Sequence, residues 1–316
     1  MLWAILITIN MSEFHKSVMI SESISALNIK KEGIYIDATF GGGGHSREIL
    51  KKLNEKGKLV VFDQDQEAIL KNNIIDKRVV IMNKNFRYLP NCLSSIAIEK
   101  VDGILADLGL SSHQINTERG FSFNSNAELD MRMNKAKSLS AQDVLNKYNK
   151  ENLSRILREY ADFSNSEKLA EKIISYRNKK YIKFPEDVLN LFANCFYVPK
   201  KNQFFARVFQ AIRIEVNDEI QALKDLLKAS LNVLNPGGRL VVISYHSTED
   251  RIVKNFMKFG HFDPFLKKDF FGNQFRPFKI INKKPIIPTL KEMNVNNRSR
   301  SAKLRVAEIN LESKNV

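Results

Sequence analysis

The stretch Asp37-Ala-Thr-Phe-Gly-Gly-Gly-Gly-His-Ser46 sets the architecture of this chain, because it joins an apolar run to a segment of helical character. The run before it, Ile34–Ala38, is nearly continuous, as is typical of a strand buried on both faces of a parallel sheet. The segment after it, Ser46–Leu53, is expected to be a helix. Consecutive glycines at such a turn let the backbone approach a ligand and leave unpaired N–H groups at a helix N-terminus. We therefore interpret the turn as a ligand-binding loop.

An acidic residue after the next apolar run indicates the kind of ligand. Asp63 follows Lys58–Phe62 and stands 20 residues after Gly43. A carboxylate in this place accepts hydrogen bonds from ribose hydroxyls, which favours a nucleoside cofactor and leaves NAD and S-adenosylmethionine open. Ser46 replaces the third glycine of the dinucleotide fingerprint, and no Walker lysine follows the glycines, which counts against a P-loop NTPase. The chain also lacks the G-x-S-x-G elbow of α/β-hydrolases.

Apolar runs and helical segments alternate along much of the chain. This alternation predicts a doubly wound α/β fold with a Rossmann-like sheet. Further strands are expected at Val79–Met82, Gly103–Leu108 and Leu240–Tyr245.

Helical periodicity replaces the strand pattern between the fourth and fifth runs. Ser140 is a predicted N-cap with Asp143 three residues later, and Pro185 suits the first turn of another helix. We predict an inserted all-helical domain at residues 116–216, with a core formed by residues 11–115 and 217–316.

The first ten residues, MLWAILITIN, are apolar but too few to span a membrane, and they lack the basic start of a signal peptide. We predict that translation begins at Met11 and that residues 1–10 are a non-native upstream extension.

The charge of the chain favours a polyanionic partner. Its 316 residues include 50 Lys and Arg against 35 Asp and Glu, a net charge of +15, and residues 251–316 contain 15 basic and 5 acidic residues. Two cysteines, Cys92 and Cys195, exclude a disulfide scaffold and a cysteine-based metal cluster, and they fit a reducing cytoplasm.

Polar residues at the ends of the fourth and fifth runs extend the candidate site. Ligands of a doubly wound sheet bind beyond the carboxyl ends of its strands, so Asp107 is expected in the cofactor crevice and His246 on the same rim. A capping or core role is the alternative for His246. Arg119 and Arg132, close to phenylalanines, suit contacts with RNA, although an internal Arg–carboxylate cluster is an equal alternative.

Together these motifs closely resemble the ribosomal RNA small subunit methyltransferase H family (MraW-like), which methylates N4 of a cytosine in 16S ribosomal RNA with S-adenosylmethionine. The resemblance extends from about His15 to the C-terminus. It rests on Gly41–Ser46, Asp63–Ala68, Asp107–Ser112, Glu118–Phe123, Leu129–Met133, Phe209–Arg213, Ser244–Arg251 and Arg298–Arg305.

The resemblance implies a class I S-adenosylmethionine-dependent methyltransferase of the EC 2.1.1 class, acting in the cytoplasm on the decoding region of 16S RNA within the small ribosomal subunit. We expect a monomer or homodimer with no metal and no membrane association. Asp107 is the candidate catalytic residue, accepting N–H bonds from the target amine. The implied cofactor contacts are Gly43, Gly44, His45, Asp63, Phe86, Asp107 and Gln114.

Four alternatives to this activity differ in their residue requirements. Cytosine C5 methylation needs a cysteine nucleophile, and neither cysteine follows a predicted strand, which disfavours it. Ribose 2′-O methylation stays open from the residues alone. An RNA-binding or assembly protein that keeps the fold without activity is disfavoured by the glycine loop, Asp63 and Asp107. A nicotinamide dehydrogenase would require a third glycine at Ser46 and a hydride-side acid–base residue.

Overall fold

The computed structural model describes residues 17–72, 74–115, 118–195, 200–263 and 276–310. Within them, strands form one sheet in the order β3-β2-β1-β4-β5-β7-β6. Strands β1 to β5 run parallel, and β7 pairs antiparallel with both β5 and β6. The strands are β1 (Ile34–Asp37), β2 (Lys58–Phe62), β3 (Val79–Met82), β4 (Val101–Asp107), β5 (Leu234–Ser244), β6 (Phe278–Ile280) and β7 (Lys303–Ile309).

The predicted doubly wound α/β fold is confirmed, and β1 to β5 occupy the predicted apolar runs. Strand β5 begins earlier than predicted, and an irregular register between Val101 and Gly103 of β4 accommodates its first residues. Strands β6 and β7 were not predicted. In β7 the pattern is obscured by Arg305, which is buried against Asp250 with 2.5 Å between Nε and Oδ1.

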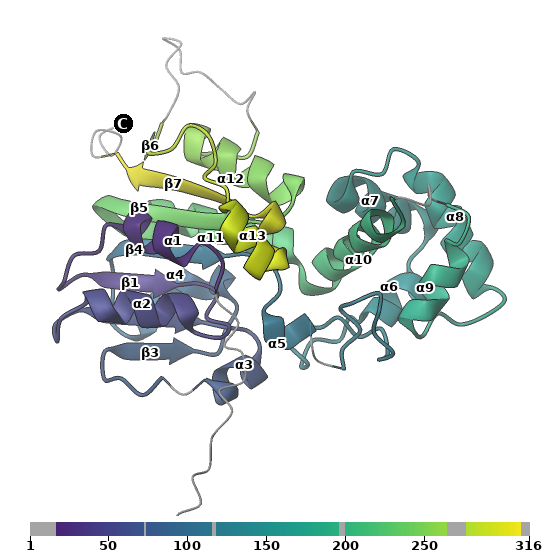
Figure 1. Cartoon of the computed structure of the whole chain (residues 1–316), viewed down its shortest axis with the longest axis horizontal. Helices are drawn as coiled ribbons and strands as arrows, with labels where there is room; N and C mark the ends of the chain where they lie inside the picture. Colours follow the sequence, from purple (N-terminus) through teal and green to yellow (C-terminus); the bar gives the residue numbers. More distant parts are fainter. Residues whose placement is uncertain (1–16, 73, 116–117, 196–199, 264–275, 311–316) are drawn as a thin grey trace, which may run out of the picture.

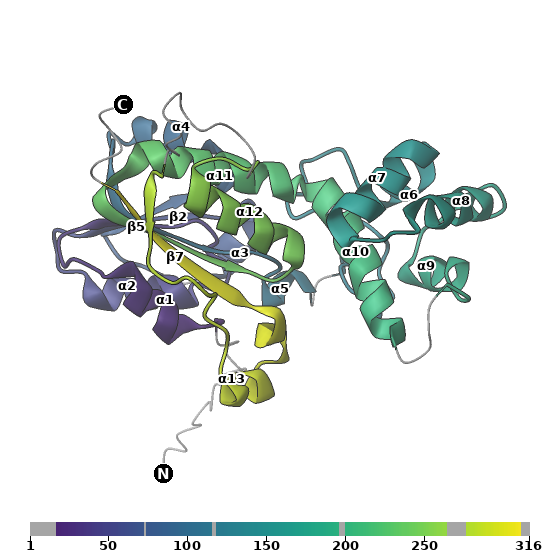
Figure 2. The ribbon, with the colours of Figure 1, turned by 90° about the horizontal axis from the view of Figure 1, so that it is seen from above.

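Helices cover both faces of the sheet (Figure 2). Successive strand residues point to opposite faces of the sheet and contribute to two hydrophobic cores, one on each face. Ile36 packs on the side of α4, α11 and α12, and Leu59 packs on the side of α1 and α2. Burial on both faces explains why the strands are continuous apolar runs. These helices are α1 (Ile20–Leu27), α2 (Gly44–Lys52), α4 (Leu89–Ser95), α11 (Glu219–Val233) and α12 (Ser247–Phe259), and the shorter elements are α3 (Gln66–Lys71), η1 (Phe86–Tyr88), α5 (Ser112–Ile115), α13 (Leu290–Val295) and η3 (Asn297–Ser301).

The described residues between β4 and α11 form helices and loops that lie beside the sheet (Figure 1). They have a hydrophobic core of their own, which includes Leu145, Ile173 and Phe205. The predicted Ser140 cap forms a capping box with Asp143, and Pro185 begins a helix as predicted. Besides α5, the helices are α6 (Ala141–Lys147), α7 (Lys150–Ala161), α8 (Ser166–Arg177), α9 (Pro185–Leu191) and α10 (Lys201–Asn217).

Two predictions concern residues that the structure does not describe. The extension at residues 1–10 and the start at Met11 lie outside the described residues, as does Asn116 at the proposed domain boundary. Among the helices that are described, none is long and apolar enough to cross a membrane.

Candidate active site

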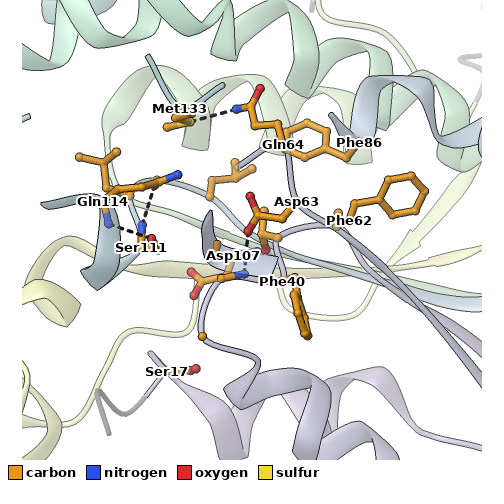
Figure 3. A pocket seen from close by; sticks show the side chains of 18 of the residues that line it. Ser17, Phe40, Phe62, Asp63, Gln64, Phe86, Asp107, Ser111, Gln114 and Met133 are labelled. Atoms are coloured by element: carbon orange, nitrogen blue, oxygen red, sulfur yellow. Dashed lines mark hydrogen bonds between the residues drawn. The ribbon is translucent and has the colours of Figure 1, made fainter. Parts of the chain in front are cut away.

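A cavity of about 640 Å³ lies at the carboxyl ends of β1, β2, β4 and β5 (Figure 3). Small-molecule sites typically have about 300–1,000 Å³. The cavity forms where strand order reverses, because β1 has β2 on one side and β4 on the other. Met133, Arg213 and Asn217 of the helical segment also line it, so both parts of the molecule contribute to its wall.

The glycine loop between β1 and α2 forms one wall of the cavity. Gly41 and Gly43 have φ angles of 48° and 72°, a left-handed conformation that favours glycine. Gly41 and Gly42 line the cavity, and a Cβ at Gly42 would meet no heavy atom within 4 Å. Gly43 and Gly44 do not line it. Gly44 instead packs closely against Ser17, since a Cβ at Gly44 would lie 2.1 Å from the Ser17 Oγ. The predicted cofactor contacts of Gly43 and Gly44 stay predictions.

Asp63 lies directly after β2, and its carboxylate is held by two backbone donors. Its Oδ2 accepts a hydrogen bond from the N–H of Gly41 at 2.9 Å, and its Oδ1 accepts one from the N–H of Asp65 at 2.8 Å. Burial, with smaller contributions from the charges of Asp65 and Asp37, raises the pKa of Asp63 to about 6. The group is thus mostly ionised at neutral pH and can accept hydrogen bonds from a ligand hydroxyl.

Asp107 ends β4, and its side chain is 21% exposed at the cavity. Its Oδ1 accepts a hydrogen bond from the Tyr245 hydroxyl at 2.6 Å, and its Oδ2 lies 3.9 Å from Nδ1 of His45. Burial raises the pKa of Asp107, while His45 and the Tyr245 hydroxyl offset part of that rise. The arrangement offers a carboxylate to a ligand with N–H donors.

The structure brings the other predicted cofactor residues to the same place. His45, Phe86 and Gln114 all line the cavity, with Phe86 on η1 beside Gln64 (Figure 3). The buried Gln114 side chain donates from Nε2 to Oδ2 of Asp65 at 3.3 Å.

The surroundings of Arg119 bear on the two interpretations that its sequence pattern left open. Only 3% of the residue is exposed, and Nη1 donates to Oδ2 of Asp65 at 2.8 Å. Its Nη2 also lies 2.7 Å from Oε2 of Glu67. The guanidinium is enclosed by these carboxylates, and this geometry favours the alternative, an internal Arg–carboxylate cluster.

His246 and Arg132 are not among the residues that line the main cavity. His246 caps α12: its Nδ1 accepts a hydrogen bond from the N–H of Glu249 at 3.4 Å. This favours the capping alternative over RNA contact. Arg132 pairs with Asp130, 2.6 Å from Nε to Oδ1, and lines a second, polar cavity. Its contact with RNA stays a prediction.

Residues that the sequence analysis did not select complete the site. Tyr245 and Asn217 line the cavity, and Arg298 of η3 reaches it by donating from Nη2 to the carbonyl of Leu110. Tyr245 could have been found, since it directly precedes His246 at a strand end. Arg298 belongs to a motif that supports the resemblance, but its place at the cavity could not have been found, because its partner lies 188 residues earlier in the chain.

A model of the MraW methylase family matches residues 12–310 of the chain. A ribosomal RNA small subunit methyltransferase H from Christiangramia forsetii is 50% identical over 296 residues, covering 93% of this chain and 97% of its own. Its counterpart from Karelsulcia muelleri is 47% identical over 299 residues, covering 94% and 99%. Among solved structures, an rRNA methylase from Streptococcus thermophilus covers 92% of this chain and 93% of its own at 11% identity and a TM-score of 0.41, too distant to carry an argument.

Proposed function

The chain belongs to the MraW methylase family, and we propose that it transfers a methyl group from S-adenosylmethionine to N4 of a cytosine in 16S ribosomal RNA. The family match confirms the resemblance found in the sequence. The observation that carries the proposal is the cavity, which combines an open glycine loop, the carboxylate of Asp63 and a second carboxylate at Asp107.

The residues of the cavity fit S-adenosylmethionine. Asp63 is placed to accept hydrogen bonds from ribose hydroxyls, and the space beside Gly42 leaves backbone accessible to the methionine end. Phe86 provides an apolar surface for an adenine ring. Neither Cys92 nor Cys195 lines the cavity, so the residues for C5 chemistry are not in place.

Residues of the chain orient the target amine of the cytosine and accept the proton that it loses. S-adenosylmethionine supplies a methyl group on a sulfonium centre that departs as a neutral thioether. The N4 lone pair, which is partly delocalised into the cytosine ring, forms the new N–C bond. We assign Asp107 Oδ2 as the acceptor of an N4–H bond, which raises the nucleophilicity of N4 and receives the proton that N4 must lose. Positioning of the two reactants supplies much of the remaining acceleration.

We further propose that residues 116–216 recognise the RNA substrate. Met133 and Arg213 from this segment line the cavity, which supports a place beside the reacting base. Exposed basic residues of the C-terminal part, such as Lys283, Lys284 and Arg300, are suited to phosphate contacts. We propose that the substrate is the assembled small subunit in the cytoplasm and that the enzyme acts as a monomer or homodimer.

A strain that lacks this chain tests the proposed activity. We expect mass spectrometry of its 16S RNA fragments to show one cytosine without its N4 methyl group, and expression of the chain to restore it. A cytosine that keeps its N4 methyl group in that strain would contradict the proposal.

Cofactor affinity is expected to decrease on acidification. Protonation of Asp63, whose pKa is about 6, removes the acceptor for the ribose, so the dissociation constant should increase about tenfold between pH 7.5 and pH 5. Calorimetric titration with S-adenosylmethionine measures this. Asp63→Asn should bind more weakly at pH 7.5, and any pH dependence that it retains comes from other groups. If the dissociation constants of the wild type and of Asp63→Asn depend equally on pH, groups other than Asp63 cause the dependence.

A further inference from the structure

The end of β5 brings a tyrosine hydroxyl to the carboxylate that the proposed function assigns to the target amine. We propose that Tyr245 is a positioning residue for methyl transfer: its hydroxyl holds Oδ1 of Asp107 and thereby directs Oδ2 to the N–H of the target amine. This inference rests on the proposed function and adds to it a residue that acts through Asp107.

The contact has the geometry of a strong hydrogen bond. The Tyr245 Oη donates to Oδ1 of Asp107 at 2.6 Å, the short distance typical of a hydroxyl and an ionised carboxylate. Oδ2 makes no hydrogen bond to the described residues and stays available to a ligand. The backbone is fixed as well, because the N–H of Asp107 donates to Oγ1 of Thr39 at 2.7 Å.

Tyr245 is itself held in place from two sides. Its ring packs against Gly109, where φ is 107° and a Cβ would lie 3.2 Å from the Tyr245 Cδ2. Its backbone N–H donates to Oε2 of the buried Glu249 at 2.9 Å. A hydroxyl whose ring and backbone are both fixed can impose one orientation on Asp107.

The charges around the pair keep the tyrosine a donor. Burial and the neighbouring Asp107 raise the pKa of Tyr245 well above its usual value, so its proton stays on the hydroxyl in the working pH range. His45 and Asp37 act on Asp107 from the glycine-loop side, and Arg298 acts on both members of the pair from η3. Tyr245 therefore does not serve as a base.

Tyr245→Phe tests the proposal with the smallest change. We expect kcat at saturating cofactor and RNA to decrease about 10- to 100-fold, the effect of one hydrogen bond to a charged group. We expect the cofactor dissociation constant to be unchanged. The acid limb of the kcat profile should move to higher pH, because Asp107 loses a donor that stabilises its ionised form.

Tyr35→Phe is the matched control. Tyr35 lies in β1, outside residues 116–216, and does not line the cavity. The substitution removes one hydrogen bond, which the Tyr35 hydroxyl accepts from the N–H of Lys30 at 2.7 Å, and it should leave kcat unchanged. If Tyr245→Phe keeps the wild-type kcat and the wild-type acid limb of the pH profile, the inference is overturned. It is also overturned if the main effect of Tyr245→Phe is a weaker affinity for the cofactor.

A double-mutant cycle adds a second test. If Tyr245 acts through Asp107, Tyr245→Phe should have little further effect on kcat in an Asp107→Asn background. The same fold decrease in both backgrounds would contradict the proposal. The wild-type enzyme in the same assay separates the two levels of inference, since absence of transfer to cytosine N4 there contradicts the proposed function itself.

Discussion

Asp107→Asn is expected to lower kcat for RNA methylation by about 100-fold at saturating cofactor, within the range for groups that assist proton transfer. The carboxylate has two acceptor oxygens, of which Oδ1 is engaged by Tyr245. Asparagine replaces one of these oxygens by an NH2 group, so either the tyrosine hydroxyl or the target N–H then faces a donor instead of an acceptor. It also lacks the charge that makes the removal of an N4 proton favourable. Single-turnover methyl transfer to small-subunit RNA measures the effect.

Asp102→Asn on the same strand is the control for this substitution. Asp102 lies near the start of β4, where its Oδ2 accepts a hydrogen bond from the N–H of Ile34 at 3.0 Å, and it does not line the cavity. We expect its kcat to equal that of the wild type. Near wild-type kcat in Asp107→Asn would show that the reaction does not depend on this carboxylate.

The sequence predicts those parts of the site whose residues lie close together in the chain and form a recognisable local pattern. The run Ile34–Ala38, the glycines and Asp63 follow one another at spacings that a βαβ unit imposes, so the loop and its carboxylate could be placed without coordinates. The same holds for Asp107, because a buried parallel strand ends in polar residues at the ligand-binding edge.

The parts that the sequence analysis missed or left open depend on contacts between distant segments. Arg298 meets Leu110 across 188 residues, and Arg119 meets Asp65 across 54. An arginine beside phenylalanines has the same local pattern whether its partner is a phosphate or a buried carboxylate. Only the fold brings Asp65, at the start of α3, under the loop that carries Arg119, and this decides between the two interpretations.

Arg119→Met is expected to lower the free energy of unfolding by about 3–5 kcal/mol, because it leaves a buried carboxylate without its cation. Asp65 is 2% exposed and accepts hydrogen bonds from Nη1 and Nη2 of Arg119 at 2.8 and 3.2 Å. Urea denaturation of the two proteins measures the loss.

Two further variants separate the buried charge from other causes. Lys135→Met removes a partner of Glu67 in the same cluster, but its side chain is 61% exposed, so the loss should be less than about 1 kcal/mol. Arg119→Met combined with Asp65→Asn should recover much of the stability, because the pair is then neutral and asparagine still caps α3. If Arg119→Met instead keeps wild-type stability and weakens RNA binding, Arg119 contacts the substrate after all. The buried cluster would then have to open when RNA binds, since the guanidinium is enclosed as the structure stands.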